Sequence, residues 1–130
     1  MEWLSINGYN TDKVGAVEIS NARIFLNDST RLNAHAAVHE LAHARQFFLE
    51  ETADLDFIGP FESAVASGNY ESVEYATGIF LEPYALTNYK EYFAELSEAY
   101  FGTNDYFPFN RSELQSFDPI GYEMVHQAWN

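Results

Sequence analysis

Two histidines and a glutamate stand in the order His39-Glu40-Leu41-Ala42-His43, within a stretch whose apolar residues recur at helical spacing. Side chains four residues apart on a helix project from the same face, so both imidazoles can bind one metal ion. Glu40 lies about 100° around the helix, where its carboxylate can reach a water on that metal. The spacing predicts a zinc site with His39 and His43 as ligands and Glu40 as general base. The alternative is that both histidines are ordinary helix residues paired with nearby acids.

A hydrolytic zinc site usually takes three protein ligands and leaves a fourth position for water. The chain has no cysteine, so the third ligand must be His, Asp or Glu. Glu91 and Glu95 stand four residues apart in a second predicted helix, so both can face the first helix. One can bind zinc while the other accepts the free N–H of a ligating imidazole, and the spacing does not say which. The alternative is a solvated acidic face, which Glu98 continues.

Around these acids the sequence resembles the catalytic domain of anthrax lethal factor and its relatives. That family places a Tyr, then three residues, then Asn-x-x-Glu-Phe-Phe-Ala-Glu, and this chain reads Tyr84-Ala85-Leu86-Thr87-Asn88-Tyr89-Lys90-Glu91-Tyr92-Phe93-Ala94-Glu95. The resemblance implies that Glu91 is the third zinc ligand and that Glu95 is the acid supporting a ligand. It also implies that Tyr84 is the phenol that assists at the oxyanion.

The resemblance covers roughly residues 14–129, and residues 100–114 also look like a branch of small lethal-factor-like proteins of fungi and bacteria. It implies a zincin-like fold, a secreted protein and a peptide or protein substrate. In such folds an edge strand binds substrate as an added strand, and residues 14–26 are the segment expected to provide it. The toxin's partner-binding and delivery domains have no counterpart here, so its toxicity and its substrate do not transfer.

The motifs together predict a zinc-dependent metallopeptidase. An endopeptidase is the favoured form, and the sequence leaves the choice between endo- and exopeptidase action open. Glu40 would take a proton as water attacks a peptide carbonyl, and zinc and Tyr84 would stabilise the oxyanion. Two rivals remain, a non-catalytic zinc-binding or protein-interaction module and a zinc hydrolase of a non-peptide amide or ester. The remaining histidines, His35 and His126, are predicted to be structural or surface residues. The cleavage motif, oligomeric state and biological role stay open.

Length, composition and charge limit the number of domains and the kinds of partner that this protein can have. A chain of 130 residues with 47% hydrophobic residues is expected to fold as one domain, residues 1–130. The net charge of -14 argues against nucleic acid and anionic membranes as partners. The sequence contains no run of 18 apolar residues, so no membrane span is predicted. It also lacks a basic start followed by a long apolar run, so no signal peptide is predicted. The missing signal peptide fits a cytosolic protein, or a mature or trimmed chain without its leader.

The predicted elements make a mainly helical α+β domain. Two short strands at residues 14–19 and 23–26 are expected to form a hairpin or edge strand packed on the first long helix, residues 32–50. The second ligand-bearing helix is predicted at residues 87–101, ended by Gly102. Three shorter helices are predicted at residues 61–67, 111–116 and 119–129. The stretch 70–83 is predicted as loop, with a helical turn near 73–76.

Overall fold

The computed structural model describes residues 31–130, with side chains from residue 35 onward. The α-helices in this range are α3 (Arg31–Thr52), α4 (Ile58–Ser67), α5 (Tyr89–Phe101), α6 (Arg111–Phe117) and α7 (Pro119–Trp129). Two strands, β1 (Val73–Glu74) and β2 (Phe80–Leu81), form an antiparallel sheet, and the 3-10 helix η2 (Tyr84–Leu86) precedes α5. This part of the chain is therefore mainly helical with a small sheet. The hairpin predicted at residues 14–26 lies outside the described residues.

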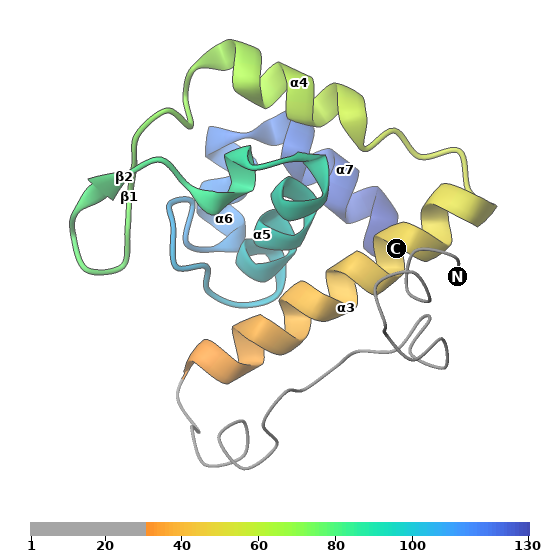
Figure 1. The fold of residues 1–130 in the computed structure, drawn as a ribbon, viewed down its shortest axis with the longest axis horizontal. Helices are drawn as coiled ribbons and strands as arrows, with labels where there is room; N and C mark the ends of the chain where they lie inside the picture. The colour runs from red at the N-terminus through yellow and green to blue at the C-terminus, as the bar shows by residue number, and fades with distance from the viewer. Residues whose placement is uncertain (1–30) are drawn as a thin grey trace, which may run out of the picture.

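Helix α5 lies at the centre of the fold, with α3 running along one side and α4 above it (Figure 1). It packs against α3, α4, α6 and α7, and every residue from 92 to 100 is buried. The predicted apolar stripe supplies Phe93 and Leu96 to the core. The face that carries Glu95 and Glu98 is also buried, at 7% and 6% exposure. The alternative that these acids form a solvated face is therefore wrong, because α3 packs against this side of α5.

Helix α5 begins two residues after its predicted start at 87 and ends at the predicted residue 101. The Asn88 side chain accepts the backbone N–H groups of Lys90 and Glu91, each at 3.0 Å. At the other end the Gly102 N–H donates to the Glu98 carbonyl at 2.9 Å. The cap holds Glu91 in the first turn, where a carboxylate is favoured by the helix dipole.

The other helices agree closely with their predicted ranges. Helix α3 extends two residues beyond the predicted end at 50, and α4 begins three residues before the predicted start at 61. Helix α4 ends at Gly68, whose φ of 68° is a left-handed conformation that favours glycine. Helix α7 has its predicted bounds, and none of the helices in residues 31–130 combines the length and apolarity needed to cross a membrane.

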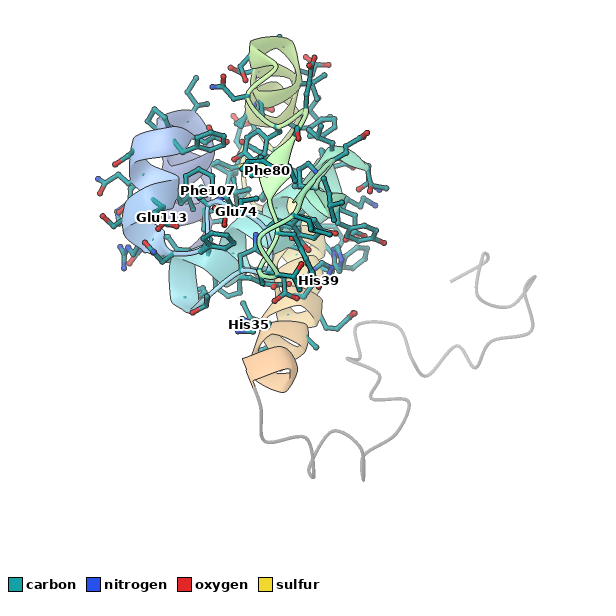
Figure 2. The ribbon with its side chains drawn as sticks, turned by 90° about the vertical axis from the view of Figure 1, so that its left-hand side faces the viewer. His35, His39, Glu74, Phe80, Phe107 and Glu113 are labelled. Carbon is teal, nitrogen blue, oxygen red and sulfur yellow. The ribbon has the colours of Figure 1, made fainter. Side chains whose placement is uncertain are left out.

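The helical turn predicted near residues 73–76 is wrong, because a β-hairpin occupies this stretch. Val73 pairs with Leu81 and Glu74 with Phe80, while the Tyr75 N–H donates to the Ile79 carbonyl at 2.7 Å. Gly78 closes the turn with a φ of 86°. Glu74 lies close to Phe107 (Figure 2), whose N–H donates to the Glu74 carbonyl at 2.8 Å. Strands of two residues are too short to show an alternating pattern in the sequence.

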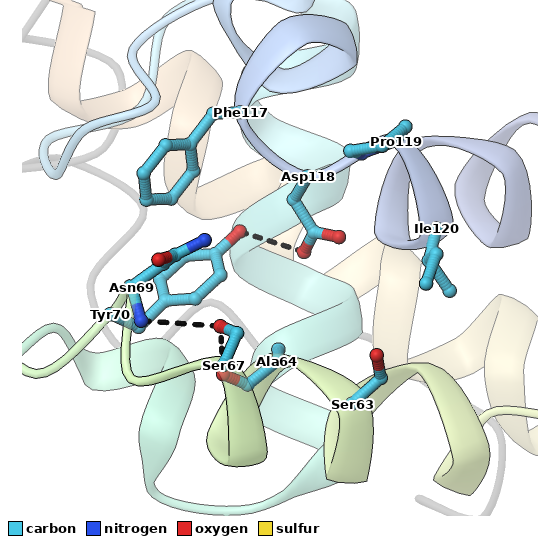
Figure 3. A pocket seen from close by; sticks show the side chains of 9 residues that line it. All are labelled: Ser63, Ala64, Ser67, Asn69, Tyr70, Phe117, Asp118, Pro119 and Ile120. Atoms are coloured by element: carbon cyan, nitrogen blue, oxygen red, sulfur yellow. Dashed lines mark hydrogen bonds between the residues drawn. The ribbon is translucent and has the colours of Figure 1, made fainter.

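A buried carboxylate joins α7 to the centre of the fold. Tyr70 donates its hydroxyl to Asp118 Oδ2 at 2.9 Å, and Tyr92 donates to the same oxygen. Asp118 Oδ1 accepts the Gly121 N–H at 2.8 Å and so caps α7. Asp118 and Tyr70 also line a cavity of about 130 Å³ (Figure 3). Burial, followed by the charge of Asp118, raises the pKa of both phenols, which therefore remain donors.

We expect Asp118→Ala to lower the free energy of unfolding by roughly 3 kcal/mol, because two buried hydroxyls lose their acceptor and α7 loses its cap. Urea denaturation of the variant and the wild type would measure the difference. Asp54→Ala, at an exposed position, is the matched control and should change stability by less than about 0.5 kcal/mol. A loss below about 1 kcal/mol for Asp118→Ala would contradict this role of the carboxylate.

Candidate metal centre

Residues from α3 and α5 bring two imidazoles and a carboxylate together. His39, His43 and Glu91 each offer one ligand atom, and these three atoms lie within 4.8 Å of one another. His39 Nε2 is 2.9 Å from Glu91 Oε2, and His43 Nε2 is 3.5 Å from Glu91 Oε1. The two imidazole rings meet edge to face with centroids 4.8 Å apart. The helical spacing of the histidines therefore places both on the side of α3 that faces α5, as the sequence predicted.

The two ring nitrogens of His39 each face a carboxylate. Nδ1 is 2.7 Å from Glu98 Oε1, while Nε2 is 2.9 Å from Glu91 Oε2. A neutral imidazole carries one N–H, so its other nitrogen would place a lone pair against a carboxylate oxygen. Either a proton or a metal cation at Nε2 removes this repulsion. Two nitrogens and one carboxylate oxygen are also ligands that zinc commonly takes, so the residues present fit a zinc ion.

A second cluster shares His39 with the first. Ligand atoms of His39, Glu95 and Glu98 also lie within 4.8 Å of one another, and both acids are buried. Glu95 Oε1 is 3.6 Å from His39 Nδ1, and Glu95 Oε2 has no hydrogen-bond partner. The sequence prediction included Glu95 but missed Glu98 as a partner of His39. The spacing of the acids at 91, 95 and 98, along one helical face, was the signal that could have found it.

Glu40 and Tyr84 lie at a cavity beside the histidines. The cavity has a volume of about 320 Å³, and its walls include His39, Glu40, Tyr84, Glu95, Glu98 and Tyr106. Tyr84 is the first residue of η2, and its ring centroid is 6.4 Å from that of His39. Both side chains are exposed, so each can reach a molecule that enters from solvent. The structure therefore brings every residue predicted for the site to one region between α3, η2 and α5.

Burial and charge set the protonation of the metal-free cluster. Burial lowers the pKa of His39, but the hydrogen bond and charge of Glu98, with the charges of Glu95 and Glu91, together raise it to about 9. Burial lowers the pKa of His43, against the charge of Glu91. Burial, followed by the charge of Glu98, raises the pKa of Glu95 to about 8. At neutral pH the metal-free cluster therefore contains a protonated His39, a neutral His43 and a protonated Glu95.

These shifts predict that the metal-free protein loses stability as the pH rises from 7 to 9.5. His39 binds its proton more tightly in the folded than in the unfolded state. Its contribution to stability is therefore fully present below the unfolded pKa of 6.5 and is lost as the pH rises to the folded pKa of about 9. Glu95 acts in the same direction up to about pH 8, because the unfolded chain releases this proton above about 4.5 whereas the folded chain keeps it until about 8. The expected loss from His39 is roughly 2 kcal/mol.

Urea denaturation in the presence of a chelator, at several pH values, would measure this dependence. Glu95→Gln should reduce the slope, because one of the two groups that release protons is gone. Stability that stays constant or rises over this pH range would contradict the protonation assigned to the cluster.

The two remaining histidines lie outside both ligand groups. His126 stacks on the Tyr122 ring, and its Nδ1 is 2.8 Å from the Tyr100 hydroxyl. These contacts agree with the structural role predicted for His126. His35 lies one turn before His39 on α3 (Figure 2) and lines the same cavity.

The candidate centre is thus formed by α3 and α5, with η2 and the cavity beside it. The carboxylates of Glu40, Glu91 and Glu98 lie around the two imidazoles and favour a cation there. Comparison with known proteins adds no relative to this description, because no family model, no curated protein and no solved structure matches the chain.

Proposed function

We propose that this protein is a zinc-dependent peptidase with a zincin-like arrangement of two ligand-bearing helices. The observation that carries the proposal is the convergence of His39, His43 and Glu91, whose ligand atoms lie within 4.8 Å of one another. The residue types and their spacing predict His39 and His43 as ligands, and the resemblance to the lethal factor family implies Glu91 as the third. The same resemblance supports the choice of peptide bonds as substrate. Glu40 and Tyr84 at the adjoining cavity support hydrolysis over simple metal storage.

Zinc, when bound, supplies a Lewis acid that lowers the pKa of water towards 7 and polarises a carbonyl. The protein's own residues perform the remaining chemistry. Glu40, exposed at the cavity, accepts a proton from the attacking water and returns it to the leaving amine. Tyr84 donates its hydroxyl to the developing oxyanion, a contribution of roughly 3 kcal/mol for one preorganised donor. An extended peptide segment is the expected substrate.

Metal analysis of the purified chain tests this proposal first. We expect about one zinc per wild-type chain and loss of the zinc in His43→Ala, because one of three ligands is removed. His35→Ala is the matched control, since His35 lies on the same helix but belongs to neither ligand group. It should keep its zinc. A chain that takes up no zinc at neutral pH would overturn the proposal.

A peptide library incubated with the zinc-loaded protein tests the reaction itself. Cleaved peptides that disappear when a chelator is added would support a peptidase. Zinc binding without any cleavage would overturn the peptidase assignment and favour a zinc-binding module or a hydrolase of other amides and esters.

A further inference from the structure

Glu98 is a buried acid whose position the peptidase motifs do not explain. It lies on α5 at 6% exposure, two turns after Glu91, on the face that packs against α3. Its Oε1 is 2.7 Å from His39 Nδ1, which is the shortest contact of that imidazole with any of the three acids of α5 around it. A charged group in this setting is expensive to bury unless a partner compensates for the lost solvation. The partner here is His39.

In a zinc-bound His39, whose ring would be neutral, the contact with Glu98 assigns the single N–H to Nδ1. Glu98 is an acceptor when ionised, so Nδ1 must be the donor, and the lone pair of the neutral ring then lies on Nε2. Nε2 is the nitrogen that faces Glu91. Glu98 therefore selects the tautomer that leaves Nε2 free to bind a metal, and it also holds the plane of the ring.

Glu95 is the other buried acid near the same nitrogen, but its geometry is poorer. Its Oε1 is 3.6 Å from His39 Nδ1, which is beyond hydrogen-bond distance. A metal ion shared by His39, Glu95 and Glu98 is the competing arrangement for these residues. The 2.7 Å separation of Nδ1 and Glu98 Oε1 is a hydrogen-bond distance, and His43 belongs only to the ligand group that contains Glu91.

We propose that Glu98 is the positioning residue of the zinc site, which orients His39 through Nδ1 so that Nε2 faces the metal. The inference rests on the proposed function, because it assigns His39 as a zinc ligand. It gives Glu98, which lies outside the family motif, the supporting role that the resemblance implies for Glu95. Loss of such an outer partner typically weakens metal binding about 10- to 100-fold.

The test compares zinc affinity, by competition with a chelator, in the full-length wild type and in Glu98→Ala, Glu98→Gln and Glu95→Gln. We expect Glu98→Ala to raise the zinc Kd about 10- to 100-fold. Glu98→Gln should recover most of the loss, because the amide oxygen can still accept the Nδ1 proton. Glu95→Gln tests the competing acid and should lose less affinity than Glu98→Ala, because Glu95 lies beyond hydrogen-bond distance of Nδ1. Glu123→Gln, at an exposed glutamate of α7 that belongs to neither ligand group, is the control and should keep the wild-type affinity.

Proton NMR of the zinc-loaded chain supplies a readout that a merely structural role would not change. The Nδ1–H of His39 should give a downfield, slowly exchanging resonance in the wild type and in Glu95→Gln, because Glu98 accepts this proton. Glu98→Ala should lose it. If Glu98→Ala does not fold, Glu98→Asp replaces it, since its shorter side chain withdraws the acceptor while keeping the charge.

The outcomes distinguish failure of the role of Glu98 from failure of the proposed zinc site. Wild-type affinity in the Glu98 variants, or a loss in Glu95→Gln as large as in Glu98→Ala, would overturn the role of Glu98 but not the zinc site. Failure of the wild type to bind zinc would overturn both.

Discussion

Replacing Glu40 with glutamine is expected to lower kcat about a thousandfold while one zinc ion per chain remains bound. Glutamine keeps the size of the side chain but cannot take a proton from water, so the proposed base is removed while His39 and His43 stay unchanged. Glu40 is exposed at the cavity and is absent from both groups of possible ligands, which is why zinc should stay. Peptide turnover and zinc content of the same preparation would measure the two effects together.

Glu51→Gln is the control for this substitution, because Glu51 is another exposed glutamate of α3 and lines no part of the cavity. It should leave kcat and zinc content unchanged. Near wild-type turnover in Glu40→Gln would show that another group is the base. Loss of zinc in that variant would instead mean that the Glu40 carboxylate helps to hold the metal.

Much of the described fold could be predicted because its signals are local. The boundaries of α5 follow from Asn88, which caps the first turn, and Gly102, which ends the last. Helix α7 follows from Asp118 and Pro119, which occupy the N-cap and the first helical position. Each signal acts within a few residues of the chain. Such boundaries need no knowledge of what packs against the helix.

The hairpin and the burial of Glu98 could not be predicted, because both depend on contacts distant in sequence. Strands β1 and β2 have two residues each, and an isolated bridge between Tyr75 and Tyr106 ties the hairpin to a segment about thirty residues later. The acids of α5 look like a solvated stripe when the helix is read alone. Only the packing of α3 on that face buries Glu98 and pairs it with His39, 59 residues earlier.

The candidate ligands also divide into those predicted from local spacing and those that only the packing of two helices distinguishes. The spacing of His39 and His43 is a property of one helix, so the sequence alone predicts that they share a face. Glu91 and Glu95 lie on one face of α5, and the spacing could not choose between them. The structure separates them by contact, because Glu91 lies near both imidazoles while Glu95 lies near Nδ1 of His39.

Replacing Glu91 with alanine is therefore expected to remove zinc binding. The loss of affinity should exceed roughly 100-fold, which is the upper end of the loss when only the hydrogen-bond partner of a ligand is removed. Glu91 is the acid that approaches both Nε2 atoms, at 2.9 Å and 3.5 Å, so no other carboxylate of α5 can replace it without moving the helix. Metal content after dialysis, followed by titration with zinc, would measure the loss. Peptide cleavage should disappear with the metal.

Glu95→Ala on the same face of α5 makes the comparison decisive, because the two ligand groups share His39 but differ in their acids. Zinc lost in Glu91→Ala and kept in Glu95→Ala places the metal between the two histidines, where the cavity with Glu40 adjoins it. The opposite result would place the metal at Nδ1 of His39, with Glu95 and Glu98. His43 would then have no ligand role, and the spacing of the two histidines would lose its chemical meaning.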